Sequence, residues 1–241
     1  MEFGTPQFWV AAMEIIVINI LLSGDNAVVI ALACRNLPAK QRVQGVLWGV
    51  VGAVVLRIIL TFFAVSLLRL PYLQLVGAAL LVYIGIGLIA EDGDDEHEIE
   101  ASDRLFAAVK TVIVADLVMS VDNVIGVAGA AKGSLSLLVF GLVVSIPLVV
   151  LGSQLIMGLI QRFPMLVIAG GGLLGYIAGE IAIADAAVKP WIDANAPVLH
   201  YLAPVAGILV VVGVGWGLTL RRRRFRFQQR SDQPSSSALK R

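Results

Sequence analysis

Long apolar segments constrain this chain more than any other feature of its sequence. A helix needs about 20 residues to cross the roughly 30 Å hydrocarbon core of a bilayer, and segments of this length recur along the whole chain. With 15% charged residues and a mean hydropathy of +0.90, the sequence excludes a soluble domain, in which about a quarter of the residues are charged. It predicts an all-α polytopic membrane protein with about seven transmembrane helices. The expected spans lie near residues 8–33, 43–68, 71–90, 105–131, 134–160, 164–184 and 201–220.

Basic residues in the connecting loops predict the orientation, because Lys and Arg are retained on the cytoplasmic side of the membrane. With the C-terminus inside, 14 of the 18 Lys and Arg residues lie inside, three lie outside, and Arg57 lies within a span. The first six residues contain no Lys or Arg, so we expect the first apolar segment to be a retained helix and not a cleaved signal. The predicted protein therefore has its N-terminus outside and its C-terminus in the cytoplasm.

An internal repeat divides the chain into two related halves. From Asn19 the sequence reads NILLSGDNAVVIALA, which recurs from Asp116 as DLVMSVDNVIGVAGA; from Pro71 it reads PYLQLVGAALLVYIG, which recurs from Pro164 as PMLVIAGGGLLGYIA. Each unit holds three expected spans, and since three is odd, the second unit must enter the membrane from the opposite side. The predicted organisation is a first three-helix repeat at 1–90, an acidic cytoplasmic loop at 91–104, a second inverted three-helix repeat at 105–184, an external loop and seventh helix at 185–220, and a basic cytoplasmic tail at 221–241.

Ionisable side chains within the expected spans are the strongest sign of a functional site, because each costs about 3 kcal/mol at the centre of a bilayer on insertion scales. Five carboxylates and one guanidinium leave a negative excess that a bound cation would compensate. We expect the guanidinium to be a fixed counter-ion of one carboxylate, and either glutamate taken singly could instead serve only to bond neighbouring helices. The six residues are Glu14, Asp25, Arg57, Asp116, Asp122 and Glu180.

Two matching polar stripes point to the kind of ligand. At 3.6 residues per turn, Asn19, Ser23 and Asn26 share one face of the first span, with Asp25 beside them. The repeat places Asp116, Ser120 and Asn123 likewise in the fourth span, with Asp122 beside them. If the two helices are antiparallel, Asn19 and Asp116 lie near the midplane, and Asp25 and Asp122 are displaced by about 9 Å towards opposite faces. Carboxylate, amide and hydroxyl oxygens are hard donors, which suit Mg²⁺, Ca²⁺ and Mn²⁺.

The phrases LSGDNAVVIALACRNLP in the first span and SVDNVIGVAGAAKG in the fourth resemble the TerC family of integral membrane proteins, in particular its short, seven-span bacterial branch. The resemblance covers residues 8 to about 220, although Asn19 stands where family members often have an acidic residue. It implies a bacterial inner-membrane protein that exports manganese. Carried over by position, it assigns the metal site to Asp25, Asn26, Asp122 and Asn123, together with Asn19 and Asp116, and we expect Glu14, Ser23, Ser120, Arg57 and Glu180 to support that site.

The sequence therefore favours an efflux carrier for a divalent metal, most readily Mn²⁺, that works by alternating access and is coupled to protons. Moving two positive charges outward costs about 4.6 kcal/mol per 100 mV of inside-negative potential, and counter-transport of two protons would cancel that cost. Two alternatives stay open: an exporter of amino acids or other organic cations, and a non-transporting membrane subunit that assists metalloprotein loading.

The same residues set the expected partners. We expect no enzyme, since no nucleophile, base and orienting residue group together, and no prosthetic group, with Mn²⁺ as the transported ion only. The partners are then the metal ion and membrane lipid but no nucleic acid, and a homodimer is one assembly that the sequence permits.

Overall fold

The computed structural model describes residues 9, 10, 13, 16, 17, 24–67, 70–90, 101–130 and 135–231, and every regular element in these ranges is a helix. The expectation of an all-α membrane protein is confirmed. The helices are α2 (Gly24–Cys34), α3 (Ala39–Leu67), α4 (Leu73–Ala90), α5 (Ala101–Ala130), α6 (Leu135–Arg162), α7 (Met165–Ala184), α8 (Lys189–Asn195) and α9 (Leu199–Ser231).

Five of the described helices are long and apolar enough to cross a membrane. They contain the segments Ala39–Phe63, Leu73–Ala90, Val139–Arg162, Met165–Ala184 and Leu199–Arg221. Helix α5 is not among the five, although its 30 residues span about 45 Å at 1.5 Å per residue. It carries several charged residues, among them Asp103, Lys110 and Asp116. Of the first expected span, α2 supplies only an 11-residue apolar helix.

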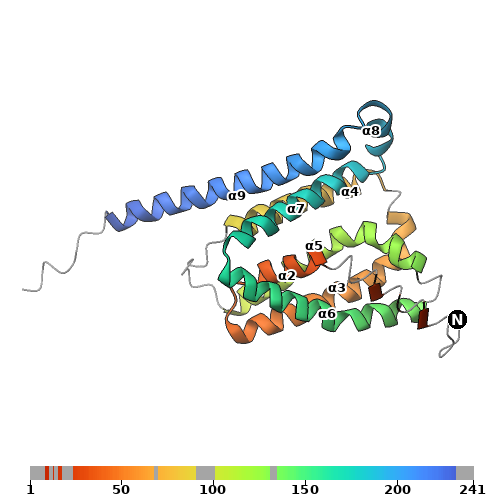
Figure 1. Cartoon of the computed structure of the whole chain (residues 1–241), viewed down its shortest axis with the longest axis horizontal. Coiled ribbons are helices and arrows are strands. Elements are labelled where there is room, and N and C mark those ends of the chain that lie inside the picture. The colour runs from red at the N-terminus through yellow and green to blue at the C-terminus, as the bar shows by residue number, and fades with distance from the viewer. Residues whose placement is uncertain are drawn as a thin grey trace, which may run out of the picture.

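Two helical segments differ from the expected connections. Helix α8 lies within the segment that we expected to be an external loop, and it has a proline in its first turn, a position where the missing N–H costs nothing. Helix α9 does not end near residue 220 but continues to Ser231, so the first part of the basic tail is helical (Figure 1). Arg and Gln are good helix formers, and no Pro or Gly interrupts this segment before Pro234.

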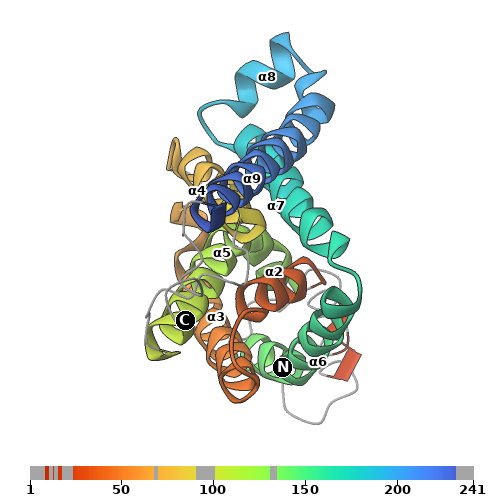
Figure 2. The ribbon, with the colours of Figure 1, turned by 90° about the vertical axis from the view of Figure 1, so that its left-hand side faces the viewer.

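The helices form two groups that lie along opposite sides of the molecule (Figures 1 and 2). Helices α4, α7 and α9 pack on one another and form the glycine-packed group, whereas α2, α3, α5 and α6 form the polar-centred group. The two groups meet where α5 contacts α4 and where α2 contacts α7. Each helix of the first repeat also contacts its counterpart in the second, in the pairs α2 with α5, α3 with α6 and α4 with α7.

Close backbone contact holds the glycine-packed group together. A Cβ atom built on Gly175 would meet the backbone of Gly207, and one built on Gly179 would meet the backbone of Ala203. Small residues at helix interfaces let backbones approach, which increases van der Waals contact where lipid provides no hydrophobic driving force. The α7–α9 pair is therefore specified by the absence of side chains at these positions.

A buried carboxylate joins the ends of two helices in the same group. Asp185 directly follows α7 and is 0% exposed. Its oxygens accept hydrogen bonds from the backbone N–H groups of Tyr72, Gln74 and Leu75 at the start of α4, and from Ala187, at 2.9–3.4 Å. The end of α7 thus lies beside the beginning of α4, and this antiparallel arrangement agrees with the expected inversion of the repeat.

Candidate functional site

A buried ion pair lies between α3 and α5 in the polar-centred group. The Arg57 Nη2 atom lies 2.6 Å from Asp116 Oδ1, and Arg57 Nε donates a hydrogen bond to Ser120 Oγ at 3.1 Å. The Ser120 hydroxyl donates in turn to Asp116 Oδ2 at 2.9 Å. Arg57, Asp116 and Ser120 are 5%, 6% and 0% exposed, so the three side chains form a closed polar cluster within the helix bundle.

Small residues on α3 place this cluster. A Cβ atom built on Gly49 would meet Val112 of α5, and one built on Gly52 would meet Ile113. One built on Gly45 would meet Leu37 and Cys34 and, slightly farther away, Leu105 of α5. Residue numbers rise together along the two helices, so α3 and α5 run parallel, and the next turns bring Arg57 to the level of Asp116 and Ser120. Asp116 and Ser120 share one face of α5 because they are four residues apart.

Helix α2 completes the site. Asn26 is 6% exposed and lines a cavity of about 20 Å³ together with Arg57, Asp116 and apolar side chains of α3 and α6; a second cavity of about 10 Å³ is also lined by Asn26 and Asp116. Asp25 is partly buried, accepts a hydrogen bond from the backbone N–H of Asn26 at 2.8 Å, and has Arg57 and Asp116 as charged neighbours. Four helices thus converge on one small polar cavity.

Three polar side chains line this cavity, the Asn26 amide, the Asp116 carboxylate and the Arg57 guanidinium. The part of the chain that the structure describes holds no cluster of three or more His, Cys, Asp or Glu side chains that could bind a metal ion. The polar lining of the cavity offers the carboxylate of Asp116 and the side-chain amide of Asn26, which are oxygen donors of the kind that hard divalent cations prefer. A cavity needs roughly 10–15 Å³ by this measure to hold one water molecule. The larger of the two cavities therefore has room for a water molecule or a dehydrated ion and not for an amino acid.

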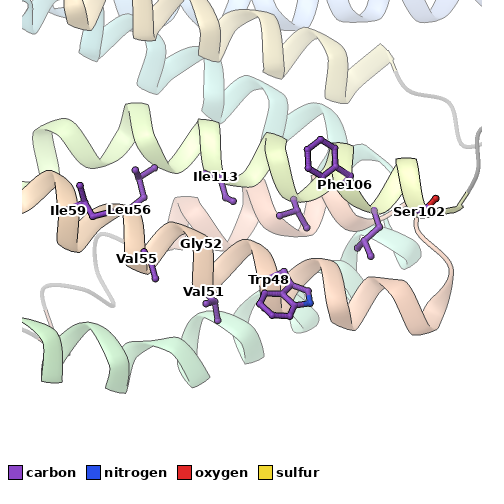
Figure 3. A pocket seen from close by; sticks show the side chains of 11 residues that line it. Trp48, Val51, Gly52, Val55, Leu56, Ile59, Ser102, Phe106 and Ile113 are labelled. Carbon is purple, nitrogen blue, oxygen red and sulfur yellow. The ribbon is translucent and has the colours of Figure 1, made fainter.

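A much larger cavity, of about 660 Å³, has a different character. It is a groove between α3 and α5, on the outer surface of the pair, and Figure 3 shows Trp48, Val55, Ile59 and Phe106 along it. Ser102 supplies the hydroxyl group of a lining that is otherwise apolar. Because no charged side chain lines the groove, it offers no carboxylate ligand for a metal ion.

Several of the residues expected at the site lie elsewhere or outside the described part of the chain. Glu14, Asn19 and Ser23 lie outside the described residues, as do the side chains of Asp122 and Asn123, whose backbone belongs to α5. Glu180 lies on an exposed face of α7, one turn after Tyr176, in the glycine-packed group. The structure brings together Asn26, Arg57, Asp116 and Ser120, with Asp25 beside them.

The axial position of α2 differs from the expectation. The two polar stripes predict that position 19 lies at the level of Asp116 and that Asn26 lies about two turns away. In the structure Asn26 itself shares a cavity with Asp116. The choice of Asp116 as the carboxylate that pairs with Arg57 was likewise not predicted, since a single sequence does not show how far one helix is shifted along another.

The sequence prediction also missed Asp185. The signal was present, because a single acidic residue directly after a long apolar span needs partners for its oxygens when it is buried. The repeat that matches Pro71 with Pro164 also matches Asp92 with Asp185. Its role is structural, since its oxygens accept hydrogen bonds from four backbone N–H groups.

Comparison with known proteins gives one family. A family model described as "Integral membrane protein TerC family" matches residues 4–224. The membrane protein YjbE of Bacillus subtilis is 42% identical over 206 residues, which are 86% of this chain and 94% of YjbE. The membrane protein YceF of the same organism is 29% identical over 57% of each chain.

A more distant relative carries a functional name. The tellurium resistance protein TerC of an Alcaligenes species is 34% identical over 88 residues, which are 35% of this chain and 25% of that protein. No solved structure matches the chain.

Proposed function

Because the chain belongs to the TerC family of integral membrane proteins, we propose that it exports a divalent metal cation across the bacterial inner membrane, with Mn²⁺ as its principal substrate. One observation carries the proposal: Asp116 and Asn26, from two helices that are related by the internal repeat, line one cavity of about 20 Å³ inside a membrane-spanning bundle. Oxygen donors suit Mg²⁺, Ca²⁺ and Mn²⁺ alike, and we propose Mn²⁺ among them because the sequence resemblance to the short branch of the family implies it.

The proposed mechanism is alternating access around this cavity. The Asp116 carboxylate and the Asn26 amide supply ligands, and Asp25 adds a second negative charge within electrostatic range. Asp122 and Asn123, the repeat counterparts of Asp25 and Asn26, would take over as ligands when the site opens to the opposite face. Binding of two protons as the metal leaves would balance the charge that is carried outward.

The distribution of basic residues supports the direction of the chain in the membrane. With the N-terminus outside, the turn before α4 and the segment after α7 both lie outside, and Asp185 joins these two segments by hydrogen bonds. Arg42, which donates hydrogen bonds to the carbonyls of Arg35 and Leu37, then lies on the cytoplasmic side. The Asp185 hydrogen bonds require the two segments that they join to lie on the same side of the membrane, and the Lys and Arg count predicts that this side is the outside.

The two alternative functions differ from this proposal in what they require. An exporter of amino acids or other organic cations needs a cavity that holds a side chain, yet the polar cavity holds about one water molecule. The larger groove has room for such a substrate but lacks a charged lining that would bind its ionised groups. A subunit that assists metalloprotein loading without transport would not need the buried carboxylate. Mutation of Asp116 therefore separates this second alternative from the proposal.

The test is metal uptake into everted membrane vesicles, in which export is read as Mn²⁺ entering the lumen. Vesicles with the wild-type protein, Asp116→Asn, and Asp103→Asn are compared with Mn²⁺, Mg²⁺ and Ca²⁺. Asp103 is the matched control, because it lies on the same helix but is exposed in the first turn.

We expect Mn²⁺ uptake with the wild type and with Asp103→Asn, and none above the empty-vesicle background with Asp116→Asn. Uptake that is equal in all three proteins would remove Asp116 from the mechanism. Wild-type vesicles that accumulate none of the three metals would refute export as the function. Repeating the assay with and without a pH gradient tests the proton coupling.

A further inference from the structure

The buried Arg57 guanidinium occupies the same carboxylate that the proposed metal site uses. Its Nη2 atom lies 2.6 Å from Asp116 Oδ1, and Arg57 is also one of the side chains that line the cavity with Asn26 and Asp116. A cation in that cavity and the guanidinium would thus compete for one negative charge. The single carboxylate of Asp116 cannot neutralise the charge of the cation and that of the guanidinium at the same time.

The charges of the described cluster make the competition specific. Asp25 and Asp116 carry two negative charges against the one positive charge of Arg57, and all three lie within electrostatic range of one another. A divalent ion bound at the Asp116 carboxylate, with the negative charge of Asp25 nearby, would neutralise Asp116 and leave Arg57 without its counter-charge. Like charges in a poorly hydrated interior repel strongly, so the ion and the guanidinium would favour different positions.

A second hydrogen bond can hold the Arg57 guanidinium in the cluster when its ion pair with Asp116 is broken. Besides the ion pair, its Nε atom donates to Ser120 Oγ, whose hydroxyl donates to Asp116 Oδ2. If the ion pair opens, the bond to Ser120 can keep the guanidinium within the bundle, next to the carboxylate. The side chain is therefore tethered in reach of Asp116 in both situations.

We propose that Arg57 is a built-in competitor of the metal ion: it neutralises Asp116 when the site is empty, is displaced when the metal binds, and helps to expel the metal by returning to the carboxylate. This inference rests on the proposed metal transport and concerns how tightly the ion is held during the cycle. Arg57 acts through Asp116 and is a positioning residue; it is not a metal ligand.

In kinetic terms, Arg57 lowers the affinity of the site for the metal ion and speeds the release of that ion. Replacing Arg57 by a neutral residue of similar size leaves Asp116 without its competitor, so the metal binds more tightly and leaves more slowly. For Arg57→Gln we expect both KM and kcat for Mn²⁺ uptake to fall by about tenfold, with kcat/KM changed much less. Arg57→Lys keeps the positive charge, and we expect its KM to stay within about threefold of the wild-type value.

The experiment measures initial rates of Mn²⁺ uptake into everted vesicles over a range of Mn²⁺ concentrations for the wild type, Arg57→Gln and Arg57→Lys. Lys110→Gln is the matched control, because it removes a positive charge from an exposed position of α5. Rates are divided by the amount of folded protein, measured by gel filtration in detergent. An unchanged or increased KM in Arg57→Gln would overturn the inference and leave the transport proposal intact.

A measurement on the wild-type protein covers the case in which Arg57→Gln does not fold. Infrared difference spectra of protein with ¹⁵N-labelled arginine, recorded before and after addition of Mn²⁺, report whether a guanidinium changes its partner. We expect a shift of the labelled guanidinium bands in the wild type that is absent in Arg57→Lys. Wild-type protein that transports Mn²⁺ but shows no such shift would refute displacement of Arg57. Wild-type protein that transports no Mn²⁺ would instead refute the function on which the inference rests.

Discussion

The two helix groups of this protein are held together by opposite means. In the polar-centred group, α3 and α5 share a buried ion pair between Arg57 and Asp116, and a small cavity lies beside it. In the glycine-packed group, the backbones of Gly175 and Gly207 come so close that neither position has room for a Cβ atom. One group depends on charge at its centre, and the other depends on shape.

This difference shows how a membrane protein can combine one group of helices whose contacts can exchange partners with another group whose packing is fixed. Lipid gives helices little hydrophobic reason to associate, so packing and polar contacts must hold them together. Polar contacts can exchange one partner for another, such as a metal ion for a guanidinium, whereas close backbone packing has no second arrangement of equal quality. If the protein carries a metal ion as we propose, the polar-centred group is the part that we expect to rearrange, while the glycine-packed group keeps its arrangement.

The largest expected effect tests the dependence on charge. Asp116→Ala removes one member of a buried ion pair and leaves the Arg57 guanidinium without compensation, which costs about 3–5 kcal/mol of stability. Denaturant unfolding in detergent measures this loss, with the exposed Asp103→Ala as control. The double variant Arg57→Met with Asp116→Leu is expected to regain most of the stability, because apolar replacement of both partners is often neutral. A double variant as unstable as Asp116→Ala would mean that this region depends on more than the ion pair.

The second prediction tests the dependence on shape. Gly207→Val places side-chain atoms against the Gly175 carbonyl, and because backbone cannot move aside, we expect a loss of about 3 kcal/mol. Gly213→Val is the control on the same helix, since a Cβ there meets nothing within 4 Å. The thermal unfolding temperatures of both variants measure the effect. Equal stability of the two variants would show that α7 and α9 are not held by their close approach.

The third prediction concerns the polar contact in the glycine-packed group. Burial alone raises the pKa of the Asp185 carboxyl, but hydrogen bonds from the backbone N–H groups of Ala187, Tyr72, Leu75 and Gln74 outweigh it and hold the pKa below its ordinary value. The ionised carboxylate therefore stabilises the fold at pH values above its unfolded pKa of about 3.9, and this contribution is lost as the pH falls through the lower folded pKa.

For Asp185→Asn we expect a loss of about 1–3 kcal/mol at neutral pH, because the amide NH₂ cannot accept the hydrogen bonds that the carboxylate accepts. The difference between wild type and variant should narrow below pH 4. Unfolding curves recorded between pH 3 and pH 7 measure both effects. A stability difference that is the same at every pH would contradict the assignment to the ionised carboxylate.

The smallest effect is expected at the corner between α8 and α9. His200 Nε2 lies 2.8 Å from Asp193 Oδ1, but the two side chains are 39% and 49% exposed. Exposed ion pairs contribute about 0–1 kcal/mol, so His200→Ala should change the unfolding free energy by less than about 1 kcal/mol. The same denaturant experiment measures this change. A loss greater than about 1 kcal/mol would show that the exposed contact between His200 and Asp193 also stabilises the fold.

Much of the fold could be predicted from the sequence because the signal is local. The spans expected at 71–90 and 164–184 correspond closely to α4 and α7, since an apolar run between breakers is visible in a single segment. The short helix α8 and the extension of α9 could not be read in this way. Their residues are too polar to stand out from a loop, and helix formation there follows from propensity and from the neighbouring helices.

The candidate site was predicted in part. Periodicity placed Asp116 and Ser120 on one face of a helix, and the structure brings both of them to Arg57. The choice of Asp116 as the partner of Arg57 depended on how far α3 is shifted along α5. The position of Asn26 beside Asp116 depended in the same way on the shift of α2 along α5. Glu180, taken to support the same site, lies in the other helix group.

The sequence by itself determined that this protein lies in a membrane, that its halves repeat, and that charged and amide side chains are carried into the bilayer. Only the tertiary structure decided which of those side chains meet, and that Asp185 joins the ends of α4 and α7. The physical reason is that hydropathy and periodicity are properties of one helix. The relative shift of two helices is set by the fit between their surfaces, in which a few missing side chains, such as those at Gly45, Gly49 and Gly52, determine how closely and at what level the helices pack.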